Sequence, residues 1–295
     1  MGFDSNGVKL LLAARKFGVS FEKVATIGRQ LFFLDLDSLK HSLEIFGINK
    51  SDSEVNRIFI EENGYCEGLL RMLGASETYS IDISDYEGAS LIHDMNNPIN
   101  ESLKNAFTVV IDSGSLEHIF NISQALKNCM EMVRLGGHFI SISPTNNFMG
   151  HGFYQLSPEF FFSTLTENNG FSLEKVIFFE NLLNPCWYEI LSPMEMKSRV
   201  GIMTLRQAYL FVCARKIEML PIFSVNPQQS DYQISWAGSN EGKVRGERKR
   251  NNAFKQTKAW LVKKFDTFRD MYILYNLLFR YKKPFMKKIS LRDLK

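Results

Sequence analysis

The 295-residue chain is long enough to bury a full core, as one large domain or as one domain with an appendage. Its 45% hydrophobic and 23% charged residues are ordinary for a globular protein, and no apolar run reaches the ~20 residues that cross a bilayer. The N-terminus lacks the basic start, long apolar stretch and cleavage site of a signal peptide. We therefore expect a cytoplasmic location, with a peripheral position at the membrane surface as the alternative.

The formal net charge of +3 conceals an uneven distribution of charge. Residues 239–295 contain 17 Lys and Arg against 5 Asp and Glu, a balance of +12. Residues 1–238 must then carry −9 to give the total of +3. An acidic body followed by a basic segment predicts two functional regions.

Cysteine and histidine spacing gives no metal or disulfide pattern. The four cysteines are Cys66, Cys129, Cys186 and Cys213. They form no CxxC pair, which favours buried free thiols in a reducing compartment. The five histidines show no HExxH spacing, so we expect no metal site.

Strand-like and helix-like patterns alternate along the chain. Helical spacing is predicted over residues 9–19, 31–46, 65–73 and 157–171, and a loop or partly ordered insertion over 47–64. Strands are predicted at 21–28, from 77 to Asp82, from 90 to Asp94, and at 173–181 and 207–216. This rhythm is typical of a doubly wound α/β sheet.

Residues 107–147 are the most informative stretch. An apolar strand ends in small and polar residues, and an amphipathic helix, a Gly-Gly turn and a second apolar strand follow. Such a strand–helix–strand unit predicts parallel strands, and parallel sheets bind ligands at the carboxyl ends of their strands.

The order of these signals over residues 20–216 resembles the class I S-adenosylmethionine-dependent methyltransferases. The resemblance implies an α/β fold: a Rossmann-like, seven-stranded, mostly parallel sheet with helices on both faces. Residues 173–181 and 208–216 would form the closing antiparallel hairpin. It also implies S-adenosyl-L-methionine as the cofactor.

The resemblance assigns cofactor-binding residues to successive strand ends. Asp82, followed by Ile83, would hold the ribose hydroxyls, and Asp94 with Met95 would meet the adenine. Ser113 and Gly114 would lie against the methionine part. Gly28 would make the first turn.

The first turn departs from the family pattern of an acid followed by several glycines. The segment reads VATIGRQLFF, with Thr26 where the acid would stand and Arg29 and Gln30 in place of small residues. Bulky side chains there should obstruct the cofactor. Either they point elsewhere while Gly28 makes the turn, with Arg29 offered to the cofactor carboxylate, or cofactor binding has been lost.

Two polar segments supply candidate catalytic residues. The first, DSGSLEH, contains Asp112, Glu117 and His118; Glu117 suits a helix start and His118 suits a general base or a structural position. The second, GHGFYQ, places His151 and Tyr154 in a glycine-flanked loop, which is typical of an active-site lid or of a well-packed turn.

The predicted domains are a methyltransferase-like α/β domain over 1–216, a linker over 217–242 and a basic amphipathic helical extension over 243–295. Aromatic residues recur at helical spacing from about 253 to 281. Such a helix would dock on the body, pair in a homodimer or lie on an anionic membrane surface. Nucleic acid is the least favoured partner, because no reading module accompanies the charge.

The leading hypothesis is methyl transfer to a small-molecule or carbohydrate-type acceptor, with His118 or His151 removing a proton from an acceptor hydroxyl. The alternative is a catalytically inactive methyltransferase-like module, recruited to a partner or membrane surface through its basic C-terminal helix. A nucleotide-sugar enzyme is a third reading, which lacks the glycine-rich first turn it would need.

Overall fold

The computed structural model describes residues 2–60, 62–240, 266–278 and 284–293. Its main sheet has nine strands in the order β11-β9-β8-β10-β7-β6-β2-β4-β5. These strands are β2 (Lys23–Ile27), β4 (Glu77–Asp82), β5 (Leu91–Ile92), β6 (Phe107–Ser113), β7 (Val133–Asn146), β8 (Phe171–Glu180), β9 (Trp187–Ile190), β10 (Ala208–Lys216) and β11 (Met286–Ile289). A separate parallel pair joins β1 (Gly2–Phe3) to β3 (Leu31–Phe32).

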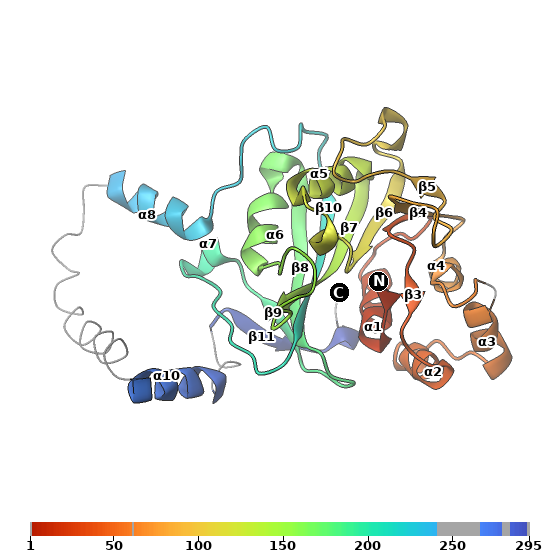
Figure 1. Ribbon diagram of the computed structural model, residues 1–295, viewed down its shortest axis with the longest axis horizontal. Helices are drawn as coiled ribbons and strands as arrows, with labels where there is room; N and C mark the ends of the chain where they lie inside the picture. The colour runs from red at the N-terminus through yellow and green to blue at the C-terminus, as the bar shows by residue number, and fades with distance from the viewer. Residues whose placement is uncertain (1, 61, 241–265, 279–283, 294–295) are drawn as a thin grey trace.

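Helices connect the strands (Figure 1). The α-helices are α1 (Ser5–Lys16), α2 (Leu36–Ile45), α3 (Asp52–Ile60), α4 (Glu67–Leu73), α5 (Ile122–Met132), α6 (Pro158–Thr164), α7 (Pro193–Met196), α8 (Ser230–Asn240) and α10 (Asp266–Leu278). Short 3₁₀ turns are η1 (Glu101–Leu103), η2 (Leu116–His118), η3 (Glu167–Asn169) and η6 (Leu291–Asp293).

The sheet confirms the predicted α/β class and corrects the strand count. The pairs β5–β4, β4–β2, β2–β6 and β6–β7 are parallel, and β10 runs antiparallel to both β7 and β8, as expected of a closing hairpin. Beyond β8 the expected seven strands become nine. Strand β9 lies between the last two predicted strands, 173–181 and 207–216, and β11 comes from the basic segment and pairs antiparallel with β9.

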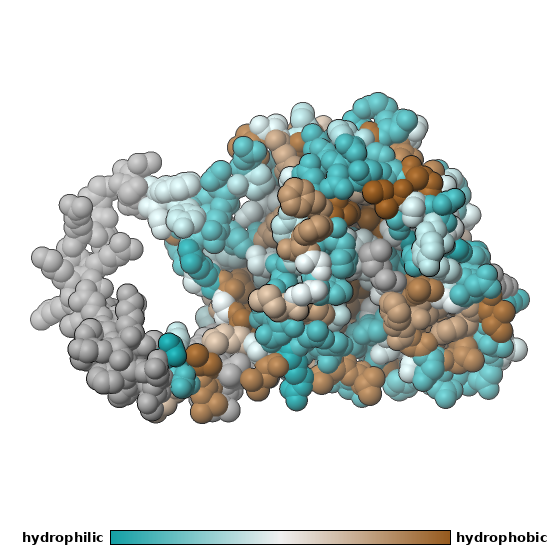
Figure 2. All heavy atoms as spheres, viewed as in Figure 1, coloured by the Kyte–Doolittle hydropathy of each residue, from teal (hydrophilic) through white to brown (hydrophobic). Residues whose placement is uncertain are grey.

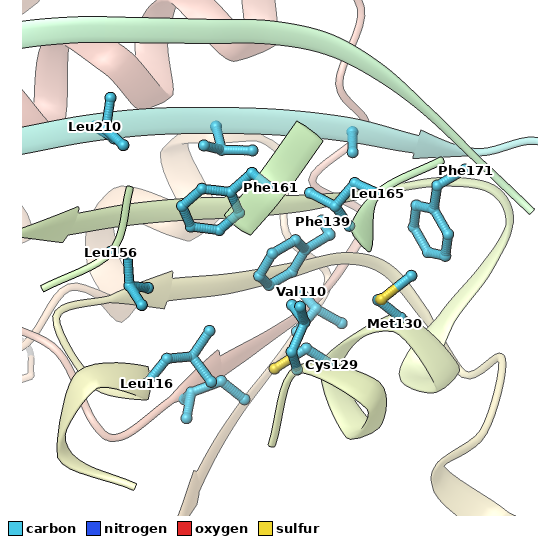
Figure 3. Packing of buried hydrophobic residues seen from close by; sticks show 14 of the residues in the cluster. Val110, Leu116, Cys129, Met130, Phe139, Leu156, Phe161, Leu165, Phe171 and Leu210 are labelled. Carbon is cyan, nitrogen blue, oxygen red and sulfur yellow. The ribbon is translucent and has the colours of Figure 1, made fainter. Parts of the chain in front are cut away.

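Two apolar layers, one on each face of the sheet, form the core. One contains side chains of α5 and α6 packed on the sheet, and the other contains those of α1 to α4. Figure 3 shows part of the first layer, where Phe161 of α6 meets Phe139 of β7 and Cys129 of α5 lies beside Val110 of β6. All seven residues of β6 are buried, as its apolar run predicts for a central strand covered on both faces.

The stretch predicted as a loop at 47–64 contains helix α3, so that prediction is wrong. Ser51 and Glu54 explain the helix: the Ser51 backbone N–H donates to Glu54 Oε2 at 2.9 Å, and the Glu54 N–H donates to Ser51 Oγ at 3.4 Å. This reciprocal pair is a capping box. Val55 and Ile58 then bury one side of the helix.

The basic segment is described only in part. The predicted helix at about 253–281 is seen as α10, and residues 241–265 and 279–283 lie outside the described residues. Met271, Tyr272, Leu274 and Tyr275 on α10 are exposed, and Figure 2 shows apolar side chains there beside the atoms drawn in grey. None of the described helices has the length and hydropathy needed to span a bilayer.

Lys216, the last residue of β10, is a buried cation. Its Nζ donates to Asn105 Oδ1 at 2.9 Å, to the Met130 carbonyl at 3.1 Å and to the Val133 carbonyl at 2.9 Å. Burial lowers the pKa of Lys216 to about 8. The unfolded chain, with an ordinary lysine pKa, therefore binds more protons than the native state between about pH 8 and pH 10.5, and this group adds stability as pH rises through that window.

Comparison of wild type with Lys216→Met in urea unfolding tests this titration. The variant lacks the ionisable group, so we expect the stability difference to move in favour of wild type by about 2 kcal/mol between about pH 7 and about pH 9.5. A difference that stays constant over this range would show that Lys216 keeps an ordinary pKa.

Candidate functional site

The carboxyl ends of β2, β4 and β5 surround a cavity of about 200 Å³. Five residues predicted to bind the cofactor line it: Gly28, Asp82, Ile83, Asp94 and Met95. They come from three strand ends that the parallel sheet order places side by side. The structure thus brings these predicted residues together at one site.

The first turn, at Gly28, has a left-handed backbone conformation. Gly28 has φ +71°, and its N–H donates to the Ile81 carbonyl at 2.7 Å. Glycine adopts this left-handed conformation without strain. The turn therefore joins the ends of β2 and β4 across the cavity.

Neither of the two bulky residues after Gly28 lines the cavity. Gln30 is fully buried, and its Nε2 donates to the Ile27 carbonyl at 2.6 Å. Arg29 pairs through Nε with Glu67 at 2.7 Å and through a terminal nitrogen with Glu62 at 3.4 Å, and its guanidinium lies over the Tyr65 ring. The expected obstruction is absent, and Arg29 is engaged by carboxylates of this chain instead of being offered to a cofactor carboxylate.

The two aspartates differ in how far their own chain satisfies them. Asp82 accepts one hydrogen bond at Oδ1, from the Ile83 N–H at 2.7 Å, and among the described residues none reaches its Oδ2. Asp94 accepts from the Asn96 N–H and side-chain amide at Oδ1 and from Asn97 at Oδ2, and the bonds from Asn96 lower the pKa of Asp94. Asp82 Oδ2 therefore keeps lone pairs for a ligand, whereas both oxygens of Asp94 already accept hydrogen bonds from its own chain.

A second cavity of about 460 Å³ lies beyond the end of β6. Ser113, Gly114, Glu117, His118 and His151 line it. His118 lines both cavities, so the two are neighbours. Two predicted cofactor residues and both candidate histidines therefore meet next to the first cavity.

Glu117, expected from the sequence only to suit a helix start, is a buried residue that lines the second cavity. It is fully buried, and neither carboxyl oxygen has a hydrogen-bond partner among the described residues. His151 Nε2 lies 3.5 Å from its Oε1, beyond good hydrogen-bond geometry. Burial, followed by repulsion from Asp112, raises the pKa of Glu117 to about 8.

Asp112 holds the turn that carries Glu117 and His118 through hydrogen bonds. Its Oδ1 accepts from the N–H groups of Ser115 and Leu116, and its Oδ2 accepts from Ser141 Oγ at 2.8 Å. Burial raises the pKa of Asp112 to about 6. The carboxylate thus fixes the start of η2, the turn that carries Glu117 and His118.

The glycine-flanked loop of residues 150–155, the His151 loop, is hydrogen-bonded to the backbone of Glu117. The Glu117 carbonyl accepts from the N–H of Phe153 at 2.7 Å and of Tyr154 at 3.3 Å. The His151 ring stands edge-on to His118, with centroids 4.9 Å apart. Burial, then His151, lowers the pKa of His118, which favours its neutral form.

Tyr154 lines neither cavity. Its hydroxyl donates to the Phe120 carbonyl at 2.6 Å, so it ties the loop to the turn after η2. Of the three predicted catalytic residues, the structure places His118 and His151 in the site and Tyr154 in its support.

No family model matches the sequence, and no curated protein matches it. Several solved structures that are similar to this chain are S-adenosylmethionine-dependent methyltransferases. A candidate methyltransferase from Listeria monocytogenes is 15% identical, with 72% of this chain and 100% of that chain covered and a TM-score of 0.39. The N-methyltransferase NodS from Bradyrhizobium japonicum WM9 is 13% identical, with 72% and 94% covered and a TM-score of 0.38. The methyltransferase CalH, solved with S-adenosylhomocysteine, is 14% identical, with 72% and 57% covered and a TM-score of 0.38. Because these identities and TM-scores are low, the function is argued below from the residues of this chain alone.

Proposed function

We propose that the protein transfers a methyl group from S-adenosyl-L-methionine to a small-molecule or carbohydrate-type acceptor. One observation carries the proposal: residues assigned from the sequence to the ribose, to the adenine and to the first turn line one cavity at the ends of parallel strands. The cavity fits the group chemically, because Asp82 keeps an oxygen free for a ribose hydroxyl and Met95 supplies an apolar wall.

The chain's own residues would bind and orient the reactants. Asp82 would accept from the ribose hydroxyls and Asp94 from the adenine amine. Ser113 and Gly114 would lie along the methionine part, toward the second cavity. When bound, S-adenosyl-L-methionine supplies an activated methyl group whose leaving group is a neutral thioether.

The second cavity would hold the acceptor. His118 and His151 are the basic groups that face it, and either is placed to take the proton of an acceptor hydroxyl. The remaining contribution is orientation of the attacking atom on the methyl carbon.

Calorimetry with S-adenosylhomocysteine and the full chain tests the proposal. We expect Asp82→Ala to weaken binding by ~30- to 150-fold, since a charged hydrogen bond contributes about 2–3 kcal/mol. Asp85→Ala is the matched control, because Asp85 is exposed and lines neither cavity. A folded wild-type protein without detectable binding, or an equal loss in Asp85→Ala, contradicts the proposal.

For the C-terminal helix we keep a homodimer contact or a membrane surface as the proposed role, supported by the exposed apolar side chains of α10.

We also propose a cytoplasmic location. All four cysteines are free; Cys66, Cys129 and Cys213 are buried as expected, whereas Cys186 is exposed. Free thiols suit a reducing compartment.

A further inference from the structure

Three residues with metal-ligating side chains converge in the second cavity, although their sequence spacing matches no metal motif. One ligand atom each from Glu117, His118 and His151 lies within 4.8 Å of the others. One carboxylate and two imidazoles are a ligand set that zinc and other divalent transition metals accept. Sequence spacing could not show this, because His151 is brought in by a separate loop.

A second observation points to a ligand at the same place. Glu117 is fully buried and lines the cavity, yet both of its carboxyl oxygens lack hydrogen-bond partners among the described residues. A buried polar group without partners is rare in native proteins and needs a physical reason. A cation at the cavity wall would satisfy these oxygens.

The surroundings of the cluster also favour a cation. Asp4 contributes a second carboxylate to the cavity, and no lysine or arginine among the described residues lines it. Tetrahedral bonds of ~2.1 Å separate ligand atoms by ~3.4 Å. The 3.5 Å between Glu117 Oε1 and His151 Nε2 already meets this spacing. His118 would complete the set through a small side-chain rotation, since no hydrogen bond among the described residues holds its ring.

We propose that Glu117, His118 and His151 bind a divalent transition metal ion, with its open positions facing the acceptor cavity. This inference rests on the proposed function and deepens it. A metal ion there supplies a Lewis acid for the oxygen of an acceptor hydroxyl. The acceptor's proton leaves to water, the carbon–oxygen bond forms as the carbon–sulfur bond breaks, and the electron pair stays on sulfur. The histidines then act as ligands, and the proton no longer has to pass to either ring.

Titration of the chelator-stripped full chain with Zn²⁺ in a calorimeter tests the site. We expect one zinc ion per chain and a loss of affinity of ~100-fold or more in Glu117→Gln and in His151→Asn, because even residues that only support a ligand contribute ~10- to 100-fold. His41→Asn is the matched control, since His41 is exposed and does not line the cavity. Titration with Co²⁺ provides a second readout, because visible absorption reports the coordination of the ion.

Glu117→Gln and His151→Asn test the same site at a buried and at a half-exposed ligand. If the buried Glu117→Gln does not fold, His151→Asn decides, because the His151 side chain is half-exposed. Absence of zinc binding, or equal affinity in wild type and His151→Asn, overturns the metal site and leaves a histidine as the base. Asp82→Ala should bind zinc as wild type does. A protein that binds S-adenosylhomocysteine but not zinc overturns only the metal site, and the reverse result overturns only the cofactor.

Discussion

Substitution of Gly152 by alanine is expected to lower the free energy of unfolding by ~3 kcal/mol and to displace the His151 loop from the site. Gly152 has φ +71°, and a Cβ atom added there would lie 2.7 Å from the Glu117 carbonyl oxygen. That carbonyl accepts the hydrogen bonds from Phe153 and Tyr154 that fasten the loop. The clash is with backbone, so the loop must move as a whole.

Gly150→Ala separates the clash from the conformational penalty. Gly150 has φ +86°, but an added Cβ would meet nothing within 4 Å. Both variants share the left-handed strain of ~1 kcal/mol, and only Gly152→Ala adds the collision. Urea unfolding of the pair therefore isolates the contact between loop and Glu117. Equal losses in the two variants would show that the loop is not held by Glu117.

The same displacement should affect the acceptor side and spare the cofactor side. Gly152 contacts Glu117, which does not line the cavity of Asp82 and Asp94. We expect S-adenosylhomocysteine binding to stay within about 2-fold of wild type, while the methyl-transfer rate falls ~100-fold, as misplacement by ~1 Å can cause. The rate is measured as release of S-adenosylhomocysteine, with an acceptor identified by mass spectrometry of co-purified ligands.

Much of the fold could be predicted from the sequence because each central strand carries its own signal. Strand β6 is a continuous apolar run that is buried on both faces, and α4 ends at Gly74 in the left-handed conformation. Helix α3 was also within reach, since Ser51 and Glu54 form a capping box that the sequence shows as S-x-x-E. The polar composition of that stretch concealed it.

The edge of the sheet was not predictable in the same way. Strands β9 and β11 have four residues each, and nearly 100 residues of chain separate Ile190 from Met286. Neither is long enough to show a periodic pattern, and their pairing depends on a contact between distant segments. A resemblance that ended at residue 216 could not include it.

The lining of the first cavity could be predicted from the sequence, and that of the second cavity only in part. Asp82 ends β4 and Asp94 comes just after β5, so sheet order alone brings them together. Glu117 was read as a possible helix start, because its burial depends on Asp112 and on the His151 loop, which lies more than 30 residues further on. Arg29 looked like an obstruction, because its partners Glu62, in the turn after α3, and Glu67, the first residue of α4, lie where the sequence does not reveal their position.

Removal of residues 284–295 is expected to leave the chain insoluble or unfolded. Phe285, Met286 and Leu291 are nearly fully buried, and β11 pairs along β9. The Leu191 N–H donates to the Phe285 carbonyl at 2.9 Å, and Lys16 of α1 contacts the Arg292 carbonyl. Three large apolar side chains contribute ~5 kcal/mol or more, which approaches the whole stability of a typical domain. The basic segment was predicted as a helical extension, but its last described residues form a strand of the main sheet and pack in the core.

A pair of point substitutions distinguishes packing from the loss of charge in that truncation. Leu291 is 5% exposed and belongs to the layer of α1, whereas Leu274 on α10 is 55% exposed. We expect Leu291→Ala to lower the unfolding free energy by ~2–4 kcal/mol and Leu274→Ala to change it by less than ~0.5 kcal/mol. Neither changes the net charge, so thermal unfolding of both reports packing alone. A stable truncated protein, or a Leu291→Ala as stable as Leu274→Ala, would mean that β11 and η6 add nothing to the core and that the basic segment serves only to bind something else.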